Sequence, residues 1–187
     1  MKFLAKKLGP VITLLTVIWA VEALNLVTGH GLTNWGILPR SLGGLIGIPL
    51  APFIHAGLWH GISNTVPVFI LGGLMLSTGE KRFWRISAMI ILISGTLVWL
   101  FARSSYHVGA SGLVLGYFGA LLARGYFERS VITIAIAIVT VALYGGLLWS
   151  LLPLRSHISF ESHIFGLLAG IAAVWLTAKQ PPKPDTD

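Results

Sequence analysis

The sequence predicts an all-α membrane protein with six transmembrane helices. Two observations predict this fold class: the composition, and the lengths of the apolar segments. Hydrophobic residues make up 55% of the 187-residue chain and charged residues only 10%, whereas soluble proteins carry about 25% charged residues. The mean hydropathy is +0.84. A single domain of this length has too few charges to cover a water-exposed surface, so we expect the lipid bilayer to be its solvent.

Six apolar segments are candidate spans, because a helix needs about 20 apolar residues to cross the hydrocarbon core. They are 10–27, 60–78, 83–102, 111–123, 131–152 and 162–178. Pro10 suits the first turn of its helix, where no backbone donor is needed. We therefore predict a six-helix membrane domain over residues 10–178, a cytoplasmic N-terminus over 1–9, and a Pro-rich, disordered cytoplasmic tail over 179–187.

The connection between the first two spans, residues 28–59, is rich in Gly and Pro and moderately apolar. It is too interrupted to be a span and too apolar to be a solvated loop. We expect this long first loop to lie in the membrane interface against the bundle.

The basic residues indicate the orientation. A cytoplasmic N-terminus leaves only Arg40, Arg103 and Arg155 of the 13 basic residues on the outer side, and cytoplasmic loops are enriched in Lys and Arg. Both termini are then cytoplasmic. The basic residues that give the net charge of +7 sit at helix ends and do not gather in one patch, so no nucleic-acid partner is predicted. The absence of cysteine excludes disulfides, thiolate nucleophiles and thiolate metal sites.

The fourth segment is short. Its 13 residues from Ser111 to Ala123, directly before Arg124, give about 20 Å of helix, less than a core of roughly 30 Å. Irregular backbone at membrane depth is tolerated only where protein or a water-filled cavity surrounds it. We therefore expect this helix to begin inside the membrane, with Ser111 as its first residue.

Three polar residues from different spans share a depth in the outer half of the bilayer. Measured along each helix, Ser111, Asn64 and His163 lie within roughly 6 Å of a common level, and His60 lies one turn above Asn64. Each alone has an ordinary explanation as a packing residue or an interhelical hydrogen bond. A nucleophile, a base and an amide at one depth instead favour an active site.

Three motifs at these positions resemble the signatures of rhomboid intramembrane proteases, on the matching helices and in the matching order. They are Gly109-Ala110-Ser111-Gly112 with Gly116, His60 to Asn64 with His55 upstream, and His163 with Gly166 and Gly170. The six spans and the long first loop match this family as well.

The resemblance implies a serine endopeptidase that cleaves transmembrane proteins near the outer side of the bilayer with a Ser111–His163 dyad. It also implies an oxyanion hole formed by His60, Asn64 and the backbone N–H of Ser111, in a bacterial inner-membrane protein without cofactor or metal. The chemistry agrees, because a serine needs an adjacent base and preorganised donors stabilise an oxyanion. The structural residues expected near the site are His55, Gly109, Gly112, Gly116, Gly166 and Gly170.

Two residues depart from the family pattern or have no assigned role. Leu115 stands where many members have an aromatic residue against the catalytic histidine, and Glu22 is a carboxylate within the first span. Two other functions stay open: a non-catalytic rhomboid-like factor that binds membrane proteins, and a transporter or metal channel using His55, His60 and Asn64. A zinc protease would need an H-E-x-x-H motif, which the chain lacks.

Overall fold

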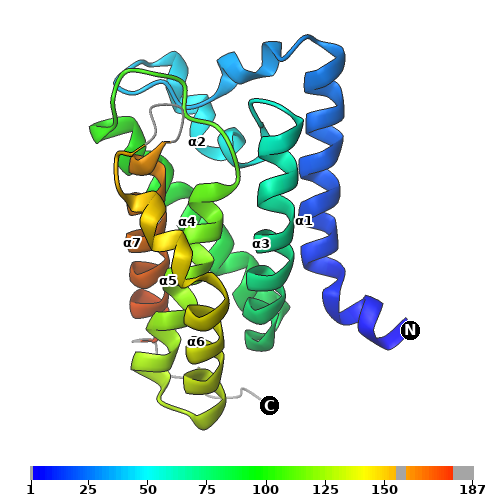
Figure 1. The fold of residues 1–187 in the computed structure, drawn as a ribbon, viewed down its shortest axis with the longest axis vertical. Coiled ribbons are helices and arrows are strands. Elements are labelled where there is room, and N and C mark those ends of the chain that lie inside the picture. The colour runs from blue at the N-terminus through cyan, green and yellow to red at the C-terminus, as the bar shows by residue number, and fades with distance from the viewer. Residues whose placement is uncertain (1, 155–158, 179–187) are drawn as a thin grey trace, which may run out of the picture.

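The structure is a computed structural model that describes residues 2–154 and 159–178, and within these residues it contains helices and no strand. Six long helices form a bundle (Figure 1). They are α1 (Lys2–Val27), α3 (Leu58–Met75), α4 (Glu80–Phe101), α5 (Ser111–Glu128), α6 (Val131–Tyr144) and α7 (Phe160–Ala178), with the short α2 (Gly47–Leu50) in the first loop. The predicted all-α class is confirmed. The expected tail, 179–187, and Arg155 lie outside the described residues.

Five segments are long and apolar enough to cross a membrane: Leu8–Val27, Leu58–Thr78, Glu80–Phe101, Val131–Leu151 and Phe160–Ala178. Large apolar side chains are exposed along their outer faces, among them Ile132 and Ile138 of α6. Such surfaces suit hydrocarbon rather than water. The chain is an integral membrane protein.

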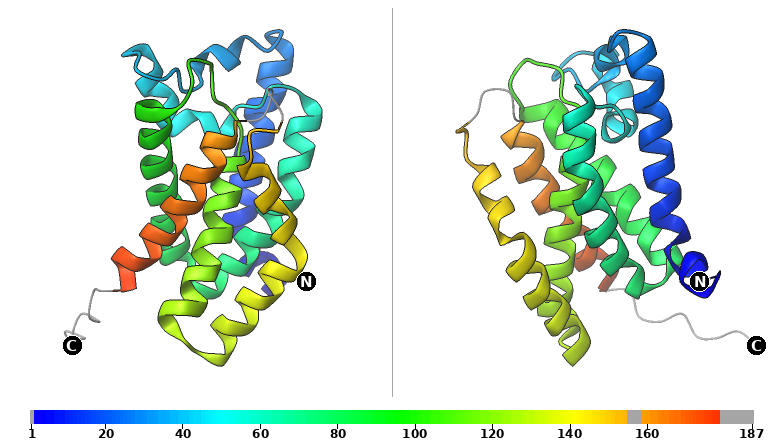
Figure 2. Two further views of the ribbon diagram at one scale, coloured as in Figure 1. Left: turned by 60° about the vertical axis from the view of Figure 1, so that its left-hand side comes forward. Right: turned by 45° about the vertical axis from the view of Figure 1, so that its right-hand side comes forward.

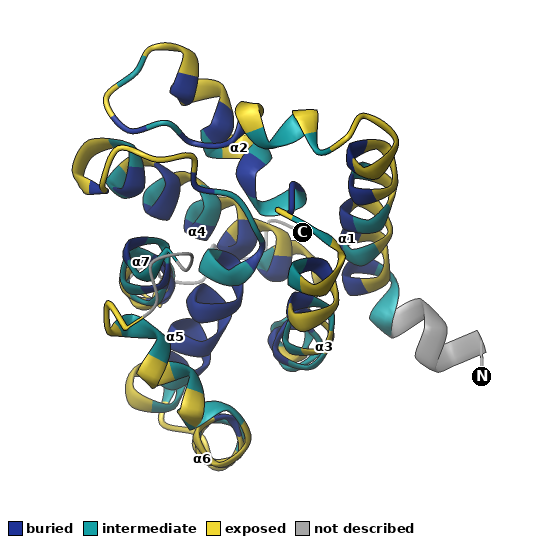
Figure 3. Cartoon of the chain, turned by 45° about the horizontal axis from the view of Figure 1, so that its top comes forward, coloured by how far each residue is buried: buried dark blue, intermediate teal, exposed yellow. Residues whose placement is uncertain are grey.

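The helix α5 lies at the centre of the bundle, and every residue from Leu113 to Leu121 is buried (Figure 3). A helix that is apolar on all sides is stable only when neighbours surround it. The segment between α4 and α5 descends from the top of the bundle before α5 begins (Figure 1). Ser111 is the first residue of α5, as predicted, and it lies within the bundle.

Two predicted helix boundaries are wrong. The first helix begins at Lys2, so Pro10 lies inside α1. A proline in a helix interior removes one backbone hydrogen bond and favours a kink, but here the helix continues on both sides of it. The fourth segment continues past residue 123 to Glu128. Arg124, which resembles the end of a span in the sequence, is buried and paired within the protein.

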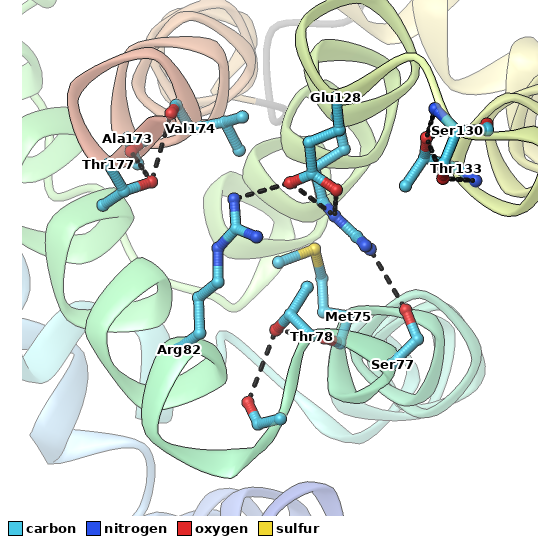
Figure 4. Close-up of polar contacts among 12 residues, drawn as sticks. Met75, Ser77, Thr78, Arg82, Glu128, Ser130, Thr133, Ala173, Val174 and Thr177 are labelled. Carbon is cyan, nitrogen blue, oxygen red and sulfur yellow. Dashed lines mark hydrogen bonds and ion pairs between the residues drawn. The ribbon is translucent and has the colours of Figure 1, made fainter. Parts of the chain in front are cut away.

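The pairing of Arg124 links α5 to the start of α4 and to the turn after α3, and Figure 4 shows its partners Glu128 and Ser77 beside Arg82. Glu128 accepts from Arg124 at 3.2 Å and pairs with Arg82 of α4 at 2.6 Å. Arg124 also donates to Ser77, which follows α3, at 3.1 Å. A buried charge is tolerated when it is paired in this way. The cluster fixes the far end of α5 between α3 and α4.

The first loop covers the opposite end of the bundle (Figure 2). It contains short 3₁₀ turns at Gly31–Trp35, Gly43–Ile46 and Ala51–Phe53, with α2 between the last two. The loop is anchored to α4, where Ile48 lies against Gly95 so closely that a Cβ atom at Gly95 would lie 2.8 Å from the Ile48 side chain. His55 lies near the end of the loop, three residues before the first residue of α3.

Candidate active site

The turn before Ser111 is held by hydrogen bonds that its N–H groups donate to the first loop. Gly109 has φ +110°, a conformation that favours glycine, and its N–H donates to the Ala51 carbonyl at 2.8 Å. The next N–H, from Ala110, donates to Nε2 of His55 at 3.2 Å. The loop therefore sets the backbone that carries the candidate nucleophile.

The backbones of α5 and α7 are in direct contact. A Cβ atom at Gly166 would overlap the Gly112 carbonyl, and one at Gly170 would overlap the Gly116 carbonyl. A Cβ atom at Gly112 would lie 3.2 Å from the Ser162 carbonyl. Residues adjacent to Ser111 and His163 in sequence thus touch each other. The candidate nucleophile and base lie on facing turns of two helices, as their glycines predicted.

The imidazole of His163 is oriented by a backbone carbonyl. Its Nδ1 lies 3.0 Å from the carbonyl oxygen of Ser150, in the 3₁₀ segment Gly145–Leu151 that follows α6. A carbonyl can only accept, so Nδ1 carries the proton and Nε2 of a neutral ring is free to accept another. Ser150 therefore orients the ring, although Leu115 replaces the family's usual aromatic residue.

His60 and Asn64 lie one turn apart on α3. His60 Nδ1 accepts the Ala56 N–H at 3.4 Å, which leaves Nε2 of the neutral ring as a donor. The ring packs on Gly109, where a Cβ atom would be 2.7 Å from Nε2. The Asn64 amide donates to the His60 carbonyl at 2.8 Å, and it has a second N–H. The structure thus places His60 at the serine turn and Asn64 one turn below it.

His55 joins the first loop, the serine turn and His60. Its side chain is buried, and its ring packs edge-to-face on the His60 ring with centroids 5.0 Å apart. The pKa of His55 is lowered from 6.5 to about 4, mainly by burial and to a smaller extent by the nearby His60, while the Phe53 carbonyl opposes this shift. The imidazole is therefore neutral at pH 7, as its role as an acceptor for Ala110 requires.

Sequence reasoning missed another buried histidine, His107, in the segment before α5. Its Nε2 donates to the Arg103 carbonyl at 3.0 Å, so its Nδ1 accepts the Ser159 hydroxyl at 2.6 Å. Its backbone pairs with Ile37, and burial lowers its pKa. Beside it, Glu161 of α7 pairs with Arg103 at 3.5 Å. These contacts fix the start of α7, two residues before His163. The only signal in the sequence is a histidine four residues before Ser111.

The described residues contain no group of three or more His, Asp or Glu side chains placed to hold a metal ion. The histidines nearest the serine turn instead contact each other and the backbone.

Comparisons with known proteins agree with the motifs. The model of the Rhomboid domain family matches residues 42–180, a range that includes every candidate site residue from His55 to Gly170. An uncharacterised protein of Mycobacterium tuberculosis is 33% identical over 175 residues, covering 89% of this chain and 73% of the relative. A protein of Bacillus subtilis, named as a candidate rhomboid protease, is 28% identical over 131 residues, covering 68% of this chain and 64% of the relative.

Proposed function

Because the chain belongs to the rhomboid family, we propose that it is an intramembrane serine endopeptidase with Ser111 as nucleophile and His163 as general base. One observation carries the proposal. The backbones of α5 and α7 touch at Gly112 and Ser162, directly beside these two residues, while the Ser150 carbonyl holds the His163 ring with Nε2 unprotonated.

In the proposed reaction, Nε2 of His163 takes the proton of the Ser111 hydroxyl as Oγ attacks the scissile carbonyl. The tetrahedral intermediate collapses when the same imidazole protonates the leaving amine. A water molecule, activated by His163, then hydrolyses the acyl-enzyme and regenerates the serine. The Ser150 carbonyl takes the orienting role that a carboxylate has in a catalytic triad.

The oxyanion would form at the N-terminus of α5. The first N–H groups of a helix have no partner within the helix, and the helix dipole favours negative charge there. The Ser111 N–H belongs to this set, and His60 Nε2–H is a second donor beside Gly109. Asn64 is the third proposed donor through its second amide hydrogen.

The proposed substrates are transmembrane proteins, which reach the site within the lipid. The N-terminal end of α1 and the tail, residues 179–187, are proposed to face the cytoplasm. The basic residues Lys81, Arg82 and Arg85 at the start of α4 support this orientation. Ser111, near the loop-covered end, then lies toward the outer side of a bacterial inner membrane.

Labelling with a fluorophosphonate serine probe tests the proposal. The wild-type protein in detergent should be labelled and should cleave a transmembrane reporter, and Ser111→Ala should lose both activities while staying monodisperse. Ser63→Ala, an exposed serine on α3, is the matched control and should keep both. Cleavage by Ser111→Ala near the wild-type rate would refute the mechanism.

His163→Ala should be nearly as inactive as Ser111→Ala, and the double variant should be no worse, because the pair acts as one unit. A wild-type protein that binds the reporter but neither reacts with the probe nor cleaves would instead support the non-catalytic binding function.

A further inference from the structure

Glu22 is a carboxylate in the interior of the bundle for which the proposed reaction has no use. Its side chain on α1 is fully buried, and neither carboxylate oxygen has a hydrogen-bond partner among the described residues. His55 is also fully buried, and its Nδ1 has no partner of acceptable geometry there. Buried polar atoms in native proteins are nearly always hydrogen-bonded. The Glu22 carboxylate and His55 Nδ1 could therefore be partners of each other.

The contact of His55 with the serine turn determines which ring nitrogen carries the proton. The Ala110 N–H can only donate, so the Nε2 atom at 3.2 Å from it accepts and carries no proton. The neutral ring then has its proton on Nδ1, which requires an acceptor. The Phe53 carbonyl lies near the ring, but it does not meet hydrogen-bond geometry with Nδ1. A carboxyl group such as that of Glu22 offers oxygen acceptors in either protonation state.

The structure places both side chains in one location. A Cβ atom added at Gly61 would lie 3.9 Å from Cγ of His55 and 4.0 Å from Cγ of Glu22. The third side chain at that point, Trp19, already donates its indole N–H to Thr65 at 3.2 Å. Its single donor is therefore used elsewhere.

A neighbour of Glu22 already binds the same loop residue. Asn25 lies three residues further along α1, on the same helix face, and it is also fully buried. Its amide donates to the His55 carbonyl at 2.8 Å and accepts the Leu32 N–H at 3.0 Å. One face of α1 thus holds the backbone of His55 and presents a carboxyl group toward its ring.

We propose that Glu22 is a positioning residue of the active site, whose carboxyl group accepts the Nδ1–H of His55 directly or through one water molecule. This contact fixes the tautomer in which Nε2 accepts the Ala110 N–H. It thereby sets the backbone of the oxyanion-binding turn and the His55 ring on which His60 packs. The role rests on the proposed function, since it serves the oxyanion hole of that reaction.

The tautomer of His55 tests the contact without reference to activity. In protein labelled with ¹⁵N-histidine, His55 should show the Nδ1–H form, identified by loss of its signals in His55→Gln. Glu22→Gln keeps an acceptor, so the tautomer should persist while the Nδ1 proton resonance shifts. Glu22→Leu should lose that hydrogen-bonded resonance. An Nε2–H tautomer in the wild type, or an Nδ1 resonance unchanged in Glu22→Gln, would overturn the proposal, even if Glu22→Leu does not fold.

Kinetics test the consequence for catalysis. Glu22→Leu should lower kcat by up to about 10²-fold with KM little changed, because misplaced catalytic groups cost rates of this order. Glu22→Gln should restore most of kcat. Ala20→Leu, which places the same side chain at an exposed position of α1, is the control and should be neutral. Wild-type kcat in Glu22→Leu, or equal losses in Leu and Gln variants, would refute the role. Failure of the wild type to react with the fluorophosphonate would refute the proposed function instead, while the tautomer result would still decide the contact.

Discussion

The contact between α5 and α7 makes Gly166→Ala a sharp test of the site geometry. The added Cβ atom would overlap the carbonyl oxygen of Gly112. Their separation would be well below 3.0 Å, a distance under which Cβ atoms essentially never contact other heavy atoms. Both partners are helix backbone, so neither can rotate away as a side chain would. The helices must separate by about 1 Å beside Ser111 and His163, a displacement that can lower a rate by about 10²-fold. Overpacking of this kind also costs about 1–3 kcal/mol of stability.

The assay is cleavage of a transmembrane reporter by Gly166→Ala, with thermal unfolding in detergent measured on the same samples. Gly73→Ala on α3 is the matched control, because its Cβ atom would lie 3.8 Å from the nearest neighbour, a Leu8 methyl group. An alanine there should leave activity unchanged and slightly raise the unfolding temperature. Wild-type cleavage and stability in Gly166→Ala would refute the inference that backbone contact sets the distance between nucleophile and base.

Three further outcomes are expected. Glu128→Ala should destabilise the protein by about 3–5 kcal/mol, because it leaves the buried Arg124 guanidinium without its carboxylate partner. Arg82→Ala removes a partly exposed partner of Glu128 and should cost less stability. Equal shifts in unfolding temperature for the two variants would contradict this. Since the pKa of His55 is about 4 in the folded protein and 6.5 in the reference state, the unfolded chain binds more protons between these values. Stability should therefore fall as pH drops from 6.5 to 4, by about 3 kcal/mol from this residue, and thermal unfolding of His55→Gln should show a flatter pH dependence. Incubation with EDTA should leave the cleavage rate unchanged, and a loss restored by a divalent metal would favour the metal-channel interpretation.

The sequence predicted the helices well because span length and apolar composition are local properties. The fold class and the first residue of α5 follow from them. The two wrong boundaries have tertiary causes. The end of α5 depends on the pairing of Arg124 with Glu128, and the sequence shows a charged residue without showing its partner. The start of α1 depends on the helix continuing through Pro10.

The candidate site was predictable as a set of residues but not as a set of contacts. Motif spacing indicated Ser111, His163 and the glycines between their helices. The orientation of His163 by a backbone carbonyl of Ser150 was not predictable, because every residue has a carbonyl and none is marked by side-chain type. The same applies to His55, whose partner is the N–H of Ala110. The catalytic roles themselves stay predictions until the variants are measured.

The central position of α5 has a consequence for biosynthesis. This helix is not among the five segments apolar enough to be a span by composition, so its integration depends on neighbours that enclose it. The helix whose backbone touches it, α7, is synthesised after it, since α7 occupies residues 160–178. The backbone contact between these two helices therefore forms only after α7 has been synthesised. A nascent chain that ends before α7 would hold the serine helix without the helix that carries the proposed base, so under the proposed mechanism it would be inactive.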